Sequence, residues 1–392
     1  VAADAAMSPA DVGWSLITTR SVFDHRAVVV GENRDELMAG LKALAAGEPH
    51  PGVIEPGSAA AVGGLGGGGV GPVLVFPGQG SQWAGMGAGL LDTSPVFAAR
   101  VADCEQALAP YVDWSLTDVL RDGVHTADLS RVDVVQPVLW AVMISLAALW
   151  DDYGVTPAAV VGHSQGEIAA ACVAGALSLQ EGARIVALRS QALRHLTGGG
   201  AMASLGISQD QAEEILAACG ERAEAVGVAA VNGPGSVVVS GPPEQVDHAV
   251  AACEEAGGRA RLIDVDYASH SPQVDEIAAE LTEVLAGVKP VPSGVAFYST
   301  VTAGRMDTAG LDTAYWVTNL RERVRFADAV RALLADGHRV FIETSTHPVL
   351  TIGLQESFEE AGVNAVTVPT LRRDHGGPAQ LTRSVAQAFT AG

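Results

Sequence analysis

A serine between two apolar segments limits the folds open to this chain more than any other feature. Residues 158–161 form a short apolar run, Gly162-His163-Ser164-Gln165-Gly166 follows, and residues 168–176 are rich in alanine. A Gly-x-Ser-x-Gly turn between a strand and a helix is typical of a nucleophile elbow, which exposes the serine hydroxyl above the edge of an α/β sheet. A Cβ atom at either glycine of so sharp a turn would collide with nearby backbone. A chance match is the alternative in a chain with 45 glycines, but the flanking strand-like and helical segments favour Ser164 as a nucleophile.

The composition excludes several classes of protein. The chain has 392 residues, of which 48% are hydrophobic, so we expect a folded protein of about two or three domains with a large core. A formal net charge of −22 argues against nucleic acid and anionic membranes as partners. The first residues lack a basic region followed by an apolar core, so we expect no signal peptide. The missing initiator methionine suggests a fragment of a longer polypeptide.

Four separated cysteines and one long apolar run bear on the compartment. Cys104, Cys172, Cys219 and Cys253 form no Cys-x-x-Cys pair, so we expect reduced core residues in a cytoplasmic protein and no metal site. The apolar run 137–150 is too short to span a bilayer and ends at two aspartates. We expect it to form a buried helix with Pro137 in its first turn.

The first 71 residues predict a small mixed unit and a linker. Residues 11–19 and 27–30 are strand-like, whereas 33–46 have helical spacing, with Asn33 as N-cap and Gly47 as the stop signal. Glycine, proline and alanine dominate residues 49–71. The Gly-x-Gly-x-x-Gly match at 64–69 precedes a strand and has no helix after it, so we interpret the segment as a flexible linker and not as a dinucleotide site.

A second polar loop follows the apolar run 73–76, which is typical of a buried parallel strand. Open α/β sheets bind ligands at the carboxyl ends of their strands, and Gln79 in this loop could present an amide to an oxyanion. The alternative for such a loop alone is a solvated turn.

Residues 200–264 predict a βαββαβ order, which is typical of a ferredoxin-like insert. His270 follows directly after this insert, in a polar turn. A serine hydroxyl needs an adjacent base to attack a carbonyl, so His270 is the candidate general base for Ser164.

Five stretches of the chain carry a resemblance to a known family. They are Gly78-Gln79-Gly80-Ser81-Gln82, Gly162-His163-Ser164-Gln165-Gly166, Leu188-Arg189-Ser190-Gln191, Tyr267-Ala268-Ser269-His270 and Asn319-Leu320. Together they resemble the acyltransferase domain of a modular type I polyketide synthase, as used in antibiotic biosynthesis. Such domains are similar to the malonyl-CoA:acyl carrier protein transacylases of fatty acid synthesis.

The resemblance covers nearly the whole chain and implies its architecture. It implies an α/β-hydrolase-like large subdomain with a ferredoxin-like small subdomain inserted, preceded by a small α/β linker domain. The implied segments are a ketosynthase-to-acyltransferase linker (1–70), the two parts of the large subdomain (71–199 and 265–371), the small subdomain (200–264) and the start of a following linker (372–392).

The resemblance also implies a role for each site residue. Ser164 would attack an acyl-CoA thioester with His270 as base, and the backbone N–H groups of Gln79 and Gln165 would hold the oxyanion. Arg189 would bind the free carboxylate of the extender unit as a bidentate ion pair; without the resemblance, an ordinary helix arginine is the better interpretation. A backbone carbonyl, mapped by motif to Asn319, would orient His270. The alternative is a hydrolase-like acid such as Asp264 or Asp266.

The implied reaction loads an extender unit onto the phosphopantetheine thiol of an acyl carrier protein, next to a ketosynthase domain of the same polypeptide and without a bound cofactor. Within the family Tyr-Ala-Ser-His accompanies methylmalonyl, so Tyr267 and Ser269 predict methylmalonyl, with malonyl and ethylmalonyl as alternatives. A serine thioesterase and a non-catalytic docking scaffold are the rival functions. For carrier docking we expect locally basic surface. The candidates are Arg321, Arg323, Arg325, Arg372 and Arg373.

Overall fold

The N-terminal unit is a two-stranded sheet with two helices. The structure, a computed structural model, describes residues 7–23, 25–54, 70–122 and 128–392. Helix α1 (Pro9–Thr19), strand β1 (Val28–Val29), helix α2 (Arg34–Ala46) and strand β2 (Val53–Ile54) make up this unit, in which β1 and β2 pair antiparallel. The predicted linker at 55–69, with its Gly-x-Gly-x-x-Gly match, lies outside the described residues.

The predicted α2 is confirmed with both of its end signals. The Asn33 side chain accepts a hydrogen bond from the Glu36 backbone N–H (3.0 Å), and Gly47 takes a left-handed conformation with φ 66°. The predicted strand over 11–19 is wrong, because these residues form α1. Ser8 caps this helix by accepting from the Ala10 backbone N–H, and Pro9 stands in its first turn, so the start signals outweigh the strand-like composition.

A six-stranded sheet forms the centre of the larger part of the chain. Its order is β10-β9-β4-β3-β11-β12, and all neighbouring pairs are parallel except β10 and β9. The strands are β3 (Val73–Phe76), β4 (Ala159–Gly162), β9 (Ala296–Ser299), β10 (Gly304–Met306), β11 (Val340–Glu343) and β12 (Val366–Pro369). Strand β4, which leads to Ser164, therefore lies inside the sheet with β3 beside it.

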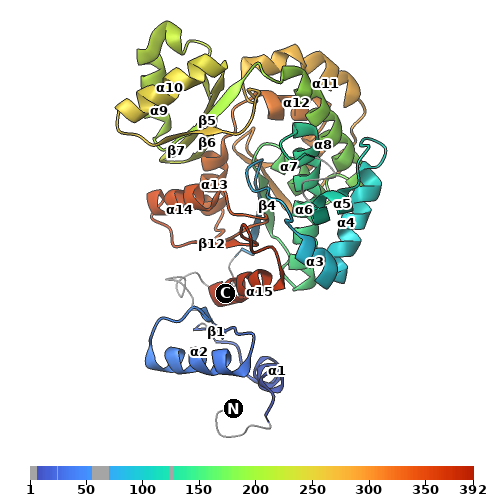
Figure 1. The fold of residues 1–392 in the computed structure, drawn as a ribbon, viewed down its shortest axis with the longest axis vertical. Helices are drawn as coiled ribbons and strands as arrows, with labels where there is room; N and C mark the ends of the chain where they lie inside the picture. The colour runs from blue at the N-terminus through green and yellow to red at the C-terminus, as the bar shows by residue number, and fades with distance from the viewer. Residues whose placement is uncertain (1–6, 24, 55–69, 123–127) are drawn as a thin grey trace.

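Helices cover both faces of this sheet, and alternate residues of β3 show why. Leu74 and Phe76 pack into one core with α4, α6 and α8, whereas Val73 and Val75 pack into a second core with α13 and α14. The first group of helices is α3 (Ala88–Thr93), α4 (Pro95–Leu108), α5 (Leu116–Asp122), α6 (Val132–Asp152), α7 (Gly166–Val173) and α8 (Leu179–Leu193). The second group is α13 (Phe326–Ala335) and α14 (Thr351–Glu360), on the other side of β4 in Figure 1. A sheet buried on both faces accounts for the continuous apolar run of β3.

Helix α6 is the long apolar helix of the core. It begins at Val132, so Pro137 lies inside it and not in its first turn as predicted. Among the described residues it is the one helix long and apolar enough to cross a membrane, but 94% of its most apolar window is buried inside the protein. The predicted buried helix is confirmed, with an earlier start.

The ferredoxin-like part is an antiparallel sheet in the order β6-β7-β5-β8 with two helices against it. Its elements follow the predicted βαββαβ order. They are β5 (Ala201–Leu205), α9 (Gln209–Cys219), β6 (Gly227–Gly233), β7 (Ser236–Gly241), α10 (Pro243–Glu255) and β8 (Ala260–Ile263). Figure 1 shows this part set apart from α3 to α6. The chain then returns through α11 (Ala278–Val284) to β9 and β10 of the large sheet, and α12 (Thr313–Arg321) follows β10.

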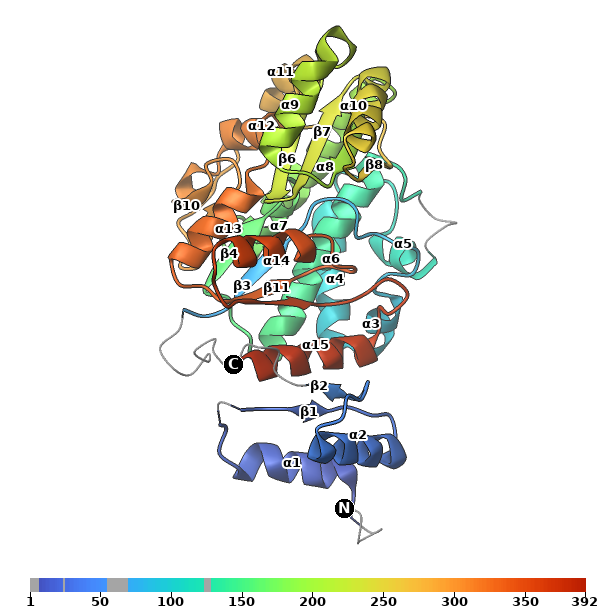
Figure 2. The ribbon, with the colours of Figure 1, turned by 90° about the vertical axis from the view of Figure 1, so that its left-hand side faces the viewer.

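The last helix, α15 (Pro378–Ala391), connects the N-terminal unit to the large sheet. It packs against β12 on one side and against β1 and β2 on the other, between the two parts in Figure 2. The Arg26 guanidinium stacks 5.2 Å from the centre of the Phe389 ring, and Arg383 donates to the Pro51 carbonyl oxygen (2.7 Å). The first and last segments of the chain therefore lie together.

Candidate active site

The turn from β4 to α7 has the geometry predicted for a nucleophile elbow. Ser164 has a φ of 54°, a left-handed conformation that side chains rarely adopt. A Cβ atom on Gly162 would overlap the Glu167 backbone, and one on Gly166 would overlap the Phe76 carbonyl oxygen. Both glycines are therefore required sterically, and the turn presents the Ser164 side chain at the carboxyl end of the sheet.

His270 lies against Ser164, although 106 residues separate them in the sequence. The Ser164 Oγ and His270 Nε2 atoms are 2.7 Å apart, and His270 Nδ1 lies 2.8 Å from the Glu322 carbonyl oxygen. Because a carbonyl oxygen only accepts, Nδ1 carries the proton and Nε2 is free to accept the hydroxyl proton of Ser164. Burial, and then the nearby Arg189 charge, lower the pKa of His270 to about 3. The imidazole is therefore neutral at pH 7.

The carbonyl that orients His270 belongs to Glu322, so the assignment of this contact to Asn319 is wrong. Asn319 lies within α12, where carbonyl groups point along the helix axis. Glu322 is the residue that ends the helix, and its extended conformation (φ −84°, ψ 157°) turns its carbonyl out of the helix. Among the described residues no carboxylate contacts the His270 ring, so Asp264 and Asp266 do not take this place either.

Arg189 points its guanidinium at the same serine hydroxyl from α8. Its Nη2 atom lies 3.2 Å from Ser164 Oγ, its Nη1 atom donates to Asn319 Oδ1 (2.6 Å), and its Nε–H has no partner although it is buried. Burial lowers the pKa of Arg189 to about 10, which still leaves it charged at pH 7. Within the described part of the chain no carboxylate lies within ion-pair distance of this cation.

The loop after β3 lies beside the elbow. A Cβ atom on Gly78 would be 3.3 Å from the His163 carbonyl oxygen and 3.8 Å from Ser164 Cβ. In the described structure the backbone N–H groups of Gln79 and Gln165 donate no hydrogen bond, and the Gln165 side chain is buried without a partner. The structure thus places the loop that contains Gln79 beside the elbow turn that contains Gln165.

Tyr267 and Ser269 lie in the same turn as His270, and both are buried. The Tyr267 hydroxyl donates to Gln79 Oε1 (3.0 Å), and burial raises its pKa to about 12, so it stays a neutral donor. Ser269 Oγ lies 3.4 Å from Met202 Sδ, which belongs to β5 of the ferredoxin-like part. Both parts of the fold therefore border the site.

One buried acid in the site was not predicted from the sequence. Glu167, in the first turn of α7, is fully buried and accepts hydrogen bonds from the Thr300 backbone N–H and hydroxyl, the Tyr315 hydroxyl and the Asn319 amide. Burial raises its pKa, and these four donors oppose that effect. The sequence signal that could have identified Glu167 is an acidic residue in an alanine-rich run, three residues after the nucleophile.

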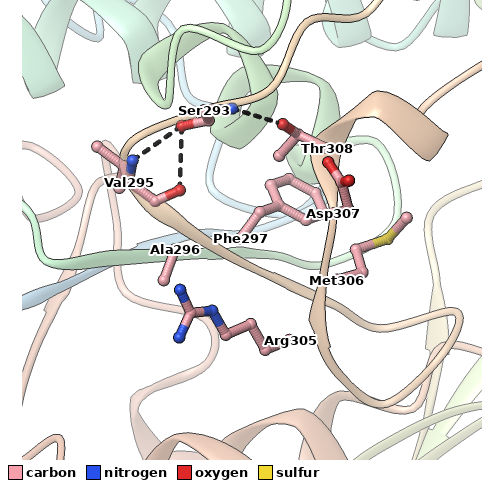
Figure 3. Close-up of a pocket in the computed structure, with 8 residues that line it drawn as sticks. All are labelled: Ser293, Val295, Ala296, Phe297, Arg305, Met306, Asp307 and Thr308. Atoms are coloured by element: carbon pink, nitrogen blue, oxygen red, sulfur yellow. Dashed lines mark hydrogen bonds between the residues drawn. The ribbon is translucent and has the colours of Figure 1, made fainter.

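A hollow of about 360 Å³ beside β9 and β10 is separate from this site. Figure 3 shows Ser293, Phe297, Arg305 and Thr308 among its walls, and none of the predicted site residues lines it. Ser293 and Thr308 hydrogen-bond to each other and to nearby backbone groups, so their polar atoms are already satisfied. We assign no ligand to it.

Comparison with known proteins places this geometry in a family. Residues 73–392 match the acyl transferase domain family. The chain is 55% identical over 389 residues to polyketide synthase GfsE of Streptomyces halstedii, covering 98% of this chain and 10% of that protein, so it spans about a tenth of that relative's length. It is also similar to the crystal structure of the acyltransferase domain from module 8 of the salinomycin polyketide synthase (52% identity, TM-score 0.92, 99% of this chain and 90% of that chain). A complex of a type II polyketide synthase acyl-carrier protein with its malonyl-transacylase is a more distant match (25% identity, TM-score 0.71, 80% of this chain and 99% of that chain).

Proposed function

Because the chain belongs to the acyl transferase domain family, in the form found in modular type I polyketide synthases, we propose that it transfers an extender unit from coenzyme A to an acyl carrier protein. The acyl group would pass through an ester on Ser164. One observation carries the proposal: the Ser164 hydroxyl lies 2.7 Å from a neutral imidazole nitrogen of His270 and 3.2 Å from the guanidinium of Arg189. A base and a carboxylate-binding cation thus meet at one nucleophile.

The first half-reaction forms the acyl-enzyme. Ser164 Oγ attacks the thioester carbonyl carbon while His270 Nε2 takes its proton, and the Glu322 carbonyl oxygen holds the ring by accepting from Nδ1–H. The carbon–sulfur bond then breaks, and the coenzyme A sulfur leaves with the proton from His270. The products are an ester on Ser164 and free coenzyme A.

The second half-reaction reverses these roles. His270 takes the proton of the phosphopantetheine thiol, and the thiolate attacks the ester carbonyl carbon. The bond to Ser164 Oγ breaks, and His270 returns the proton to the serine. Each half-reaction needs the imidazole to begin neutral, which agrees with its pKa of about 3.

The oxyanion formed in each half-reaction needs hydrogen-bond donors. We assign this role to the backbone N–H groups of Gln79 and Gln165, which lie on adjacent turns and donate no other hydrogen bond in the described structure. Loss of one such donor typically costs about 3–4 kcal/mol of transition-state stabilisation. The Tyr267 hydroxyl supports the first of them by holding the Gln79 side chain.

Arg189 would select acyl groups that carry a free carboxylate. Its charge is buried with no carboxylate within ion-pair distance among the described residues, and its Nε–H lacks a partner. A buried donor without a partner is costly, and a substrate carboxylate would satisfy it through a charge-assisted hydrogen bond. The acyl carboxylate is therefore the missing partner of this side chain.

Among the acyl groups with a carboxylate we propose methylmalonyl. Ser269, next to His270, is small, and a phenylalanine in its place would occupy space that the C2 methyl group needs. A single methyl group is worth about 1–3 kcal/mol of discrimination, or roughly 10- to 200-fold. We therefore expect strong but incomplete selectivity over malonyl.

The partner of the second half-reaction is an acyl carrier protein in this proposal, as in the distant match described above. Arg373 donates to the Gln82 carbonyl oxygen, so it and its exposed neighbour Arg372 lie beside the loop that holds Gln79. Two exposed cations at this place suit an acidic carrier. We also propose that residues 1–70 connect this domain to a ketosynthase of the same cytoplasmic polypeptide, and that residues 372–392 begin the next linker.

A competition experiment tests the substrate assignment. The protein is mixed with equal methylmalonyl-CoA and malonyl-CoA, quenched early, and its acyl adduct is weighed as intact protein. We expect mainly methylmalonyl, and the double variant Tyr267→His/Ser269→Phe should shift the ratio toward malonyl. A mainly malonyl adduct would refute the methylmalonyl assignment, and rapid release of free acid in the presence of carrier protein would indicate a thioesterase.

A further inference from the structure

We propose that Glu167 is a positioning residue, which orients the carboxylate-binding Arg189 through the side chain of Asn319. The inference rests on the proposed function of the site and extends it to residues that do not touch the substrate. Ser164 Oγ in the elbow turn contacts Arg189 of α8, Arg189 contacts Asn319 of α12, and Asn319 contacts Glu167 of α7.

Glu167 is held rigidly from two directions. Its Oε1 atom accepts from the backbone N–H (2.5 Å) and the hydroxyl (2.8 Å) of Thr300, and its Oε2 atom accepts from the Tyr315 hydroxyl (2.5 Å) and Asn319 Nδ2 (2.9 Å). Two donors converge on each oxygen, so the ionised carboxylate satisfies all four of them. Ser299 fixes Tyr315 in turn, since their hydroxyl oxygens are 2.7 Å apart.

This carboxylate determines which way the Asn319 amide faces. A carboxylate only accepts hydrogen bonds and a guanidinium only donates them, so Asn319 must turn its NH₂ group to Glu167 and its oxygen to Arg189. The contact between Arg189 Nη1 and Asn319 Oδ1 is 2.6 Å. The same NH₂ group lies 3.4 Å from the Ser164 carbonyl oxygen, so it also contacts the elbow turn.

The neutral amide also keeps the charge of Arg189 available. Glu167 neutralises part of this charge at a distance, but Asn319 stands between the two and prevents a direct ion pair. A carboxylate in direct contact would compete with the substrate for the guanidinium. The arrangement therefore holds Arg189 in place, while its Nε–H stays unpartnered and its charge has no direct ion-pair partner among the described residues, so that both can meet the acyl carboxylate.

The test measures kcat/KM of the whole chain for methylmalonyl-CoA and for propionyl-CoA, which lacks the carboxylate. In Glu167→Gln a donor replaces one acceptor oxygen, so Asn319 can turn over and face Arg189 with its NH₂ group. We expect the ratio of the two kcat/KM values to fall about tenfold, mainly through KM for methylmalonyl-CoA, as loss of one charge-assisted contact predicts. Asn319→Asp should lower the ratio further, because the new carboxylate pairs with Arg189 directly.

Glu343→Gln is the matched control. Glu343 is also a fully buried carboxylate with four donors, from Ser345, Val349, Leu350 and Thr351, but it contacts neither Asn319 nor Arg189. We expect its substitution to lower stability without changing the ratio.

Three outcomes separate the possible failures. If the wild type forms no acyl-enzyme, or Arg189→Ala keeps the ratio, the proposed function fails. If the wild type behaves as proposed but Glu167→Gln keeps the wild-type ratio, the positioning role is overturned. If circular dichroism shows that Glu167→Gln does not fold, two other variants test the proposal. They are Tyr315→Phe, which removes one of the four donors to Glu167, and Asn319→Asp. Unchanged ratios of the two kcat/KM values in both variants overturn the proposal.

Discussion

Removing the Arg189 side chain should reverse the preference of the site for carboxylated acyl groups. In the proposed complex the guanidinium forms two charge-assisted hydrogen bonds with the acyl carboxylate, one of them from the buried Nε–H that has no partner. Each such bond contributes about 1.5–3 kcal/mol, so Arg189→Ala should cost about 3–6 kcal/mol for methylmalonyl-CoA. This corresponds to a loss of roughly 10² to 10⁴ in kcat/KM.

Propionyl-CoA has no carboxylate, and its kcat/KM should change far less. The catalytic base is retained, because burial is the main cause of the low pKa of His270 and the charge of Arg189 comes second. The assay follows release of free coenzyme A with each substrate. Arg184→Ala is the control, since Arg184 lies on the same helix but donates to the carbonyl oxygens of Val284 and Ala286. Equal losses on both substrates in Arg189→Ala would refute the carboxylate-binding role.

Three further predictions concern the electrostatics of the site and of the surface. Because the pKa of His270 is lowered to about 3, kcat/KM for acylation should show no loss on the acid side between about pH 5.5 and 8, and a limb with an apparent pKa near 6.5 would contradict this. The buried His270 and the partly buried His163 both have lowered pKa values, so they bind fewer protons in the folded chain than in the unfolded one. The free energy of unfolding, measured by urea denaturation, should therefore fall as the pH decreases below about 6.5. For carrier docking, the double variant Arg372→Glu/Arg373→Glu should raise KM for the carrier protein more than charge reversal at the other three candidate arginines. Those three are already in ion pairs, namely Arg321 with Asp275, Arg323 with Glu213 and Arg325 with Asp328. An unchanged KM in the double variant would place docking elsewhere.

Much of the fold could be predicted because local sequence signals agreed with the final packing. The continuous apolar run of β3 and the glycines of the elbow have one structural solution each, namely a strand buried on both faces and a turn too tight for a Cβ atom. The strand predicted over 11–19 failed because composition was given more weight than the Ser8-Pro9 helix start. The start of α6 was predicted too late, at Pro137, because Asp133 and Gln136 interrupt the apolar pattern before it, although the helix is buried almost throughout.

Within the site, residue types could be predicted but not every contact. The motifs identified Ser164, His270 and Arg189, and the structure brings all three together. The orienting carbonyl was assigned by motif to Asn319, three residues early, because a motif match does not show which residue ends the helix and turns its carbonyl outward. Glu167 was missed because a lone acid in an apolar run shows its purpose only when Thr300, Tyr315 and Asn319 surround it.

The central claim is that Ser164 carries the acyl group between the two thiols, and intact-protein mass measurement tests it most directly. After brief exposure to methylmalonyl-CoA, the wild type should gain the mass of one methylmalonyl group and lose it again when carrier protein with a free phosphopantetheine thiol is added. Ser164→Ala should remain folded and gain no mass. An adduct of the same mass and stability on Ser164→Ala would contradict the account.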